Sequence, residues 1–372
     1  MSTKRCTIKL FDIGNNSSRL SNRLRHRYHR FSHMSSARTA RNAGPADPEF
    51  GFGILGIGMH LPDEVLTNEH FTRTAGVDAD WVLTKTGVEQ RRRCENGIRT
   101  ADLAATAGRA ALANARIASS PEQDGTPDLL IIATSSPDRQ VPAPAFDVHA
   151  RLGLPISAAL SLDGGCAGFG QGLVTAYSYF SAGITKSALV IGAHRSEFLV
   201  DDSDRRIGPL FGDGAGAFLL GPVPGGYGIL TARMFTDTTH IETLRTPMRD
   251  ELVGNREYLQ MDGRGVAVLF AQQIPRILEE SLAAASLTLD RIDHFILHQG
   301  NVRMVERFAA ALGLRPELVA VSGRVVGNTA AASLPISVVL RQQERPFRRG
   351  DIVALITAGA GINGAVVLLR WY

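Results

Sequence analysis

The chain has 372 residues, of which 44% are hydrophobic and 20% charged, as expected of a globular protein with one large or two medium-sized domains. No apolar run is long enough to cross a bilayer, so we expect neither a membrane protein nor a membrane partner. The cysteines are odd in number and widely spaced, which argues against a disulfide framework or a zinc site and favours a reducing, cytoplasmic compartment; they are Cys6, Cys94 and Cys166.

The net charge of +4 is unevenly distributed along the chain. Residues 1–48 contain ten Lys and Arg but only Asp12 and Asp47 as acids, a net of +8, so the rest carries −4. This distribution argues against a general nucleic-acid-binding protein. We expect residues 1–48 to form a disordered basic extension, because they are rich in Arg, Ser, Asn and His without periodicity. Three explanations stay open: an organellar targeting peptide, an upstream start with Met34 as the true one, or a partner-binding tail.

From Phe52 onward, apolar runs and amphipathic segments alternate, which predicts an α/β protein. The strongest helix runs from Thr100 to Ala118, and the continuous apolar run 127–134 is typical of a strand buried on both faces. The other elements expected in the first half are a strand at 53–58, helices at 66–75 and 80–86, a proline-rich loop at 136–144, a helix ending near Gly153, a strand at 158–162, a helix at 170–180, and strands at 187–192 and 212–221.

The second half of the chain weakly repeats the first. The repeat pairs the helix 104–117 with 274–287, and the strands 128–134, 188–192 and 214–220 with 293–299, 354–358 and 359–369. It therefore predicts two copies of a strand–helix unit, back to back. In this pairing Cys166 corresponds to the turn 326–329, which we expect to follow a strand and to begin a helix at 330–340.

The turn around Cys166 is the first candidate for chemistry. Residues 163–170 read Asp-Gly-Gly-Cys-Ala-Gly-Phe-Gly, directly after a predicted strand and directly before a predicted helix. The free N–H groups and the dipole of a helix N-terminus stabilise a thiolate, and an oxyanion formed beside it. Cys166 is therefore a candidate nucleophile, although a buried structural cysteine is the commoner role of a free Cys.

Two further polar residues fall at equivalent points of the repeat. His298 ends an apolar strand, and Asn328 lies in the turn that corresponds to Cys166. Taken alone, the histidine would be a core residue and the asparagine a helix cap. Because both positions should converge with Cys166 on the pseudo-twofold axis, we expect the three side chains to form one site.

These motifs resemble those of β-ketoacyl-acyl carrier protein synthase III, a condensing enzyme of the thiolase superfamily. The resemblance runs from about Phe52 to the end of the chain and is carried, in family order, by the segments 80–87, 136–142, 163–170, 211–216, 298–301 and 327–335. It implies a duplicated, thiolase-like fold with five layers, α/β/α/β/α, in which residues 52–222 and 223–372 form the two halves. It also implies a homodimer.

The resemblance implies a two-step reaction that starts a fatty acid or a polyketide chain. Cys166 would take the acyl group from an acyl-CoA, with the backbone N–H groups of Cys166 and Ala360 as the oxyanion hole. Malonyl-acyl carrier protein would then lose carbon dioxide, and His298 Nε2 and Asn328 Nδ2 would stabilise the enolate that attacks the acyl group. This chemistry needs no metal or other cofactor, and its product is a 3-oxoacyl-acyl carrier protein.

The resemblance also suggests binding residues outside these three: Trp81, Lys85 and Arg205 for coenzyme A, and Arg303 for the acidic carrier protein. Each has a plainer alternative, which is core packing for the tryptophan and a solvated surface for the arginines.

Departures from the family pattern leave the acyl primer and the exact extender open. Gly164 and Gly165 replace the usual alanines, Lys85 stands where arginine is common, and the turn 361–364 is one residue shorter and lacks a tryptophan. The smaller side chains are expected to widen the acyl pocket. Two other functions stay open as well: an acyltransferase on the same scaffold that acts on a hydroxyl or amine without decarboxylation, and a non-catalytic partner that binds a carrier protein.

Overall fold

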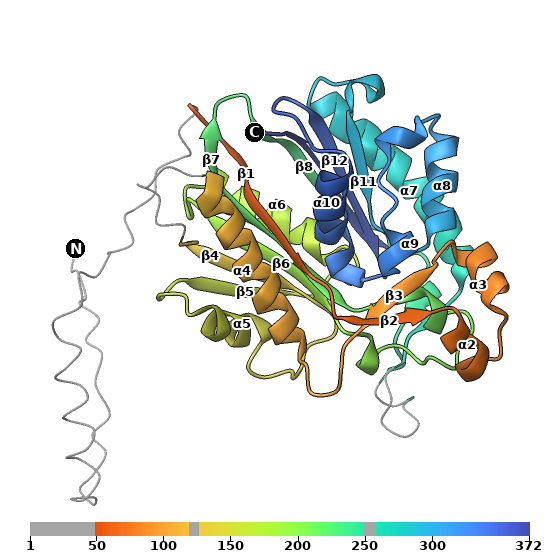
Figure 1. Cartoon of the computed structure of the whole chain (residues 1–372). Helices are drawn as coiled ribbons and strands as arrows, with labels where there is room; N and C mark the ends of the chain where they lie inside the picture. Colours follow the sequence, from red (N-terminus) through yellow and green to blue (C-terminus); the bar gives the residue numbers. More distant parts are fainter. Residues whose placement is uncertain (1–48, 119–125, 249–250, 252–257) are drawn as a thin grey trace, which may run out of the picture. The chain divides into compact units, whose positions relative to one another are not determined.

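The structure is a computed structural model that describes residues 49–118, 126–248, 251 and 258–372 (Figure 1). The chain divides into two units, Met1–Asn42 and Ala43–Tyr372, and all described elements belong to the second. The basic extension predicted at 1–48 lies outside the described residues. Among the helices that the structure describes, none is both long and apolar enough to cross a membrane.

The first sheet consists of β1 (Phe50–His60), β4 (Leu129–Ala133), β5 (Ala158–Leu162), β6 (Ala188–His194) and β7 (Gly214–Pro224). Its strand order is β1-β7-β6-β4-β5. Strands β4, β5 and β6 are parallel, whereas β7 runs antiparallel to both β6 and β1. Every residue of β4 and β6 is buried, as expected of apolar strands that are covered on both faces.

The second sheet consists of β8 (Gly228–Thr236), β11 (His294–Leu297), β12 (Ile352–Gly359) and β13 (Asn363–Arg370), in the order β11-β12-β13-β8. Its β11 and β12 are parallel and its other pairs antiparallel, so it reproduces the order β4-β6-β7-β1 of the first sheet. The counterpart of β5 is reduced to one bridge, between Val319 and Phe295. The predicted duplication is therefore confirmed, although β7 ends at Pro224, just past the expected boundary at 222.

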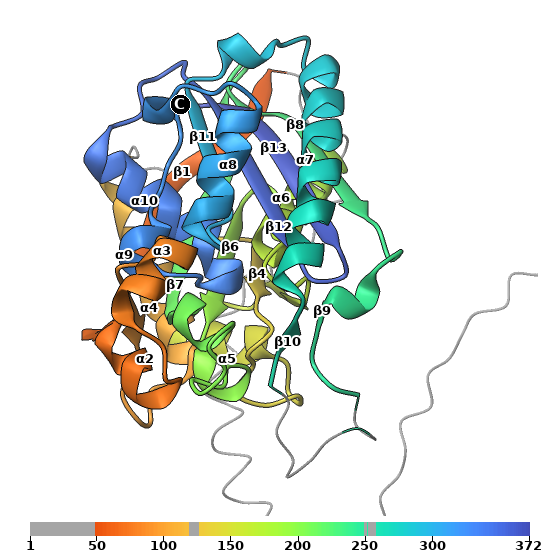
Figure 2. The same cartoon turned by 90° about the vertical axis from the view of Figure 1, so that its right-hand side faces the viewer.

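Three layers of helices enclose the two sheets (Figures 1 and 2). The outer face of the first sheet is covered by α4 (Thr100–Ala118) and α5 (Pro144–Leu152), and that of the second by α7 (Gly263–Ala284) and α8 (Val302–Ala311). Between the sheets lie α6 (Gly168–Ser181) and α10 (Ser333–Glu344), each in contact with strands of both. The five-layered α/β/α/β/α fold is thus confirmed.

The remaining elements are short. They are β2 (Glu64–Thr67), α2 (Glu69–Thr74), α3 (Ala79–Thr86), β3 (Gln90–Arg93), β9 (Leu244–Arg245), β10 (Gln260–Met261), α9 (Gly323–Val326) and the 3-10 turns η1 (Ser196–Phe198), η2 (Gly208–Leu210), η3 (Ile241–Thr243), η5 (Leu289–Arg291), η6 (Pro316–Leu318) and η7 (Ala330–Ala332).

One difference from the sequence prediction concerns the segment expected to be a helix at 66–75. Its first residues belong to β2, which pairs with β3, and the helix α2 begins only at Glu69. The arginine-rich β3 was not expected as a strand. Its Arg91 is fully buried, and its two terminal nitrogens donate to Leu66 O, Asn68 Oδ1 and Pro209 O, which compensates for much of the cost of burying the guanidinium.

A second difference concerns the turn 326–329, and the expectation that it follows a strand is wrong. The preceding residues form α9, because Gly323 N–H donates to Gln299 Oε1 and Gly327 N–H donates back to Gly323 O, which closes a helical turn. After the turn, the chain passes through η7 before α10 begins at Ser333.

Candidate active site

Cys166, His298 and Asn328 all line one pocket, which we call the thiol pocket. It contains about 590 Å³ of space including its open mouth. Most of its other walls are apolar and come from η2, β9, β10, α7, α8 and the end of β12. The structure therefore brings together the three residues that sequence reasoning selected.

An apolar side pocket, with about 450 Å³ of space including its open mouth, adjoins the thiol pocket between α7 and α8. The two pockets share six lining residues: Phe270, His298, Gly300, Asn301, Met304 and Ala358. Deeper in, the side pocket is lined by aliphatic and aromatic side chains such as Ile274 and Phe308. An apolar group can therefore lie next to the histidine without leaving the site.

The cysteine turn places Cys166 just before the first turn of α6. Gly164 O accepts from Ala167 N–H, Gly165 O accepts from Gly168 N–H, and Gly165 has a φ of 57°, which favours glycine. The carboxylate of Asp163 accepts from Gly165 N–H and from Ser135 Oγ. The predicted order of strand, turn and helix is therefore correct, and the proline-rich loop lies against the turn.

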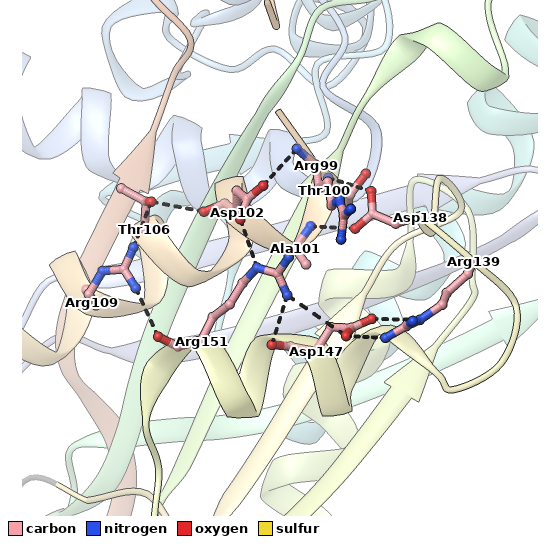
Figure 3. A network of polar contacts seen from close by, with 10 residues as sticks. All are labelled: Arg99, Thr100, Ala101, Asp102, Thr106, Arg109, Asp138, Arg139, Asp147 and Arg151. Carbon is pink, nitrogen blue, oxygen red and sulfur yellow. Dashed lines mark hydrogen bonds and ion pairs between the residues drawn. The ribbon is translucent and has the colours of Figure 1, made fainter. Parts of the chain in front are cut away.

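That loop is anchored by the polar network drawn in Figure 3. Asp138 caps α4 by accepting from Thr100 N–H at 2.8 Å and from Ala101 N–H at 3.0 Å. Arg139 pairs with Asp147 of α5 through two hydrogen bonds. The loop begins directly after Ser135, which contacts the cysteine turn, and is thus fixed to both outer helices of the first sheet.

Burial sets the protonation of the two titratable groups in the thiol pocket. It raises the pKa of the Cys166 thiol to about 12, and the charge on Asp163 acts in the same direction, while a backbone hydrogen bond opposes the rise. Burial lowers the pKa of His298 to about 4. Near neutral pH the resting site therefore contains a thiol and a neutral imidazole. The thiol must lose its proton as it attacks.

Backbone contacts orient the two side chains opposite the thiol. His298 N–H donates to Ile356 O and so continues the β11–β12 pairing to the end of the strand. Asn328 Oδ1 accepts from Ala330 N–H at 2.9 Å, which turns its Nδ2 toward the pocket. A β-carbon built at Gly300 would lie 3.0 Å from His298 Nε2 and 3.9 Å from Asn328 Nδ2. The two donors therefore face a common point.

The turn after β12 closes the site on the other side of the cysteine. A β-carbon at Gly359 would lie 2.9 Å from Cys166 N and 2.8 Å from Ala167 N, so only glycine allows this close approach. A β-carbon at Gly165 would lie 3.4 Å from Ala360 N. The backbone N–H groups of Cys166 and Ala360 thus belong to two turns in direct contact, which is the arrangement that the predicted oxyanion hole requires.

None of the four binding residues suggested by the resemblance is among the residues that line the two pockets. Trp81 is partly buried against a small apolar cluster, Lys85 is exposed at the end of α3, and Arg205 is exposed. Arg303 donates to two carbonyls at the end of α3 and pairs with Glu306. The roles of these four residues stay predictions.

Three site residues escaped the sequence analysis. Gly300 shapes the space between the two donors, and Gln171 and Asn363 form a hydrogen bond beside the cysteine turn. The only signal in the sequence was indirect: Gly164 and the short turn at 361–364 were recognised as departures, but the residues that fill the space around them were not.

Comparison with known proteins agrees with this geometry. The family model described as 3-oxoacyl-[acyl-carrier-protein (ACP)] synthase III matches residues 160–238, and the model of its C-terminal part matches residues 282–371. The β-ketoacyl-[acyl-carrier-protein] synthase III of Geobacillus kaustophilus is 36% identical over 321 residues, which cover 86% of this chain and 99% of that protein. The β-ketoacyl-[acyl-carrier-protein] synthase III of Rhodospirillum centenum is 37% identical over 325 residues, which cover 86% of this chain and 98% of that protein.

Solved structures extend the agreement to the backbone. The 3-oxoacyl-[acyl-carrier-protein] synthase III of Aquifex aeolicus superposes with a TM-score of 0.80 at 32% identity, covering 86% of this chain and 100% of that one. The priming β-ketosynthase of the R1128 polyketide pathway superposes with a TM-score of 0.81 at 26% identity, covering 89% of this chain and 98% of that one. This chain therefore belongs to the β-ketoacyl-acyl carrier protein synthase III family.

Proposed function

We propose that this protein condenses an acyl-CoA primer with malonyl-acyl carrier protein, giving a 3-oxoacyl-acyl carrier protein, coenzyme A and carbon dioxide. The observation that carries the proposal is that a thiol, an imidazole and a carboxamide from three distant segments, Cys166, His298 and Asn328, line one pocket. Family membership supports the same reaction, as the start of a fatty acid or polyketide chain.

In the first step, the protein acts as an acyltransferase toward its own cysteine. The sulfur of Cys166 attacks the thioester carbon, the bond between that carbon and the sulfur of coenzyme A breaks, and the proton of Cys166 leaves with coenzyme A. The negative oxygen formed on the way is held by the N–H groups of Cys166 and Ala360.

In the second step, malonyl-acyl carrier protein loses carbon dioxide, and its thioester oxygen takes up the negative charge. Neutral His298 and Asn328 donate to this oxygen from Nε2 and Nδ2. The resulting carbon nucleophile attacks the acyl carbon, the bond from that carbon to the sulfur of Cys166 breaks, and the thiolate that leaves takes up a proton from water. An amide donor at position 328 favours decarboxylation, because a carboxylate there would repel the enolate. A carboxylate at this position would instead suit transfer of the acyl group to an alcohol.

The setting of the reaction follows from the family and is part of the proposal. We propose that the protein is a cytoplasmic homodimer. Within each subunit, the two halves of the chain, 52–222 and 223–372, both contribute residues to the site. Trp81, Lys85 and Arg205 would bind coenzyme A, and Arg303 the acidic carrier protein. The position of Arg303 on α8, between the pocket residues Asn301 and Met304, supports this role.

Intact-protein mass after incubation with a panel of acyl-CoAs tests the first step, and release of labelled carbon dioxide from malonyl-acyl carrier protein tests the second. We expect an acyl adduct that Cys166→Ala abolishes. His298→Ala and Asn328→Ala should retain the adduct and lose carbon dioxide release. An adduct without carbon dioxide release in the unmodified protein would replace the proposal with simple acyl transfer. Absence of any adduct would refute the enzymatic role.

A further inference from the structure

The space beside Gly164 is filled by a side chain from α6. A β-carbon built at position 164 would lie 2.0 Å from Oε1 of Gln171 and 2.6 Å from its Cδ. The amide of Gln171 therefore occupies the position that an alanine methyl group would need. The expectation that a small residue here widens the acyl pocket is not met at Gly164, because Gln171 takes up the room.

Gln171 reaches across to the other half of the fold. Its Nε2 donates to Oδ1 of Asn363 at 3.0 Å, and both side chains are half-buried. Asn363 in turn donates from Nδ2 to Ala360 O at 2.5 Å. Each amide thus has a defined orientation, and the pair connects the helix that follows the nucleophile with the turn between β12 and β13.

This turn carries the N–H group assigned to the oxyanion hole. Asn363 pairs with Gly359 at the base of the turn, and Gly359 abuts the backbone N of Cys166. A hydrogen bond to Ala360 O restrains the peptide on one side of Ala360, while the β pairing restrains Gly359 on the other. The position of Ala360 N–H relative to Cys166 therefore depends on the Gln171–Asn363 pair.

We propose that Gln171 and Asn363 are positioning residues that hold the Ala360 amide in place for the oxyanion of the acylation step, and that Gly164 provides the space for them. The expected effect on the rate of Cys166 acylation rests on the proposed function, whereas the restraint of the turn by the amide pair does not. Neither residue lines the described thiol pocket, so they act through the turn and not through contact with substrate.

The decisive variant is Gln171→Met, which keeps the length of the side chain and removes the donor. We expect the single-turnover rate of Cys166 acylation to fall about 10- to 100-fold, because a displaced Ala360 N–H stabilises the oxyanion less well. The KM for acyl-CoA should change little, because this N–H acts on the oxyanion and not on the bound substrate. Alkylation of Cys166 by iodoacetamide forms no oxyanion and should keep its rate. Gly164→Ala should slow acylation by every primer alike.

Two further variants separate positioning from general damage. Thr175→Val, one helical turn after Gln171, removes only a bond from Thr175 Oγ1 to Gln171 O and should acylate normally. Gln171→Glu cannot donate to Asn363 as a carboxylate but can as a carboxylic acid, so its deficit should shrink as the pH falls toward the carboxyl pKa. Equal slowing of acylation and alkylation in Gln171→Met, or slowing by Gly164→Ala of long primers alone, would overturn the proposal.

Amide hydrogen exchange tests the structural part independently of activity. In Gln171→Met, the amide of Ile362, which lies in the same turn and donates to Asp237 O, should exchange about tenfold faster than in the unmodified protein, whereas Thr175→Val should leave it unchanged. Unchanged exchange in Gln171→Met would refute the restraint even if acylation were slow. Faster exchange in a protein that forms no acyl adduct would instead retain the restraint and refute the proposed function.

Discussion

Gly300 lies directly beside His298: a β-carbon at position 300 would be 3.0 Å from Nε2 of the imidazole. The same point is 3.9 Å from Nδ2 of Asn328, and Gly300 lines both the thiol pocket and the side pocket. The glycine therefore keeps open the space onto which both donors face. A larger residue there would compete with the enolate oxygen for that space.

Substitution of Gly300 should affect the second step and leave the first intact. A methyl group at 3.0 Å needs a shift of only a few tenths of an ångström, so Gly300→Ala should retain most of its condensation activity. The branched side chain of Gly300→Val cannot be accommodated in this way and should lower condensation about 100-fold or more. Acyl adduct mass and carbon dioxide release, measured on the same samples, check this. Loss of the adduct together with condensation would contradict it.

The fold and the three central residues were predictable because they follow from repeating patterns. Apolar runs that match between the halves gave the two sheets, and strand ends at matching positions brought Cys166, His298 and Asn328 together. The strand β3 was not predictable, since the hydrogen bonds that allow its Arg91 to be buried go to carbonyl groups of β2 and η2, which are distant in the sequence. The Gln171–Asn363 pair was hidden for the same reason: a side-chain contact over 192 positions has no local pattern.

Acid should destabilise the protein through His298. Its pKa is about 4 in the folded state and 6.5 in the unfolded chain, so the unfolded chain binds more protons between these values and stability falls as the pH drops from 6.5 toward 4. This group alone should cost about 2 kcal/mol on going from pH 7 to pH 5. Urea unfolding at both pH values should show a smaller loss for His298→Gln than for the unmodified protein.

The comparison with His298→Gln is needed because a second buried histidine acts in the same direction. Burial also lowers the pKa of His194 to about 4, and that residue is present in both proteins. Its contribution therefore cancels in the difference between the two pH dependences. An identical loss in the two proteins would contradict the neutral, buried state of His298.

The cap on α4 should contribute measurably to stability. Asp138→Ala removes the acceptor for Thr100 N–H and Ala101 N–H and should lower the free energy of unfolding by about 1 kcal/mol. Arg139→Ala breaks only the half-exposed ion pair to Asp147 in the same network and should cost less than about 0.5 kcal/mol (Figure 3). Urea unfolding of both variants tests the ranking, and equal costs would refute it.

Substitution of Arg303 should weaken binding of the carrier protein and leave binding of acyl-CoA nearly unchanged. Its guanidinium is held by Leu83 O and Thr84 O and pairs with Glu306, so the side chain is already ordered and would lose little entropy on binding the carrier protein. Arg303→Ala should raise the KM for malonyl-acyl carrier protein about tenfold and leave that for acyl-CoA within about twofold. Added salt should raise the former KM in the unmodified protein more than in the variant.

The matched control is Arg315→Ala, beyond the far end of α8. Arg315 is exposed and, like Arg303, is paired with a glutamate, here Glu317, but the length of the helix, about 15 Å, separates it from the thiol pocket. If only the overall charge of this face attracted the acidic carrier protein, both variants would raise its KM equally. A larger effect of Arg303→Ala would instead assign the attraction to the arginine that adjoins the pocket, where the carrier must deliver its malonyl group.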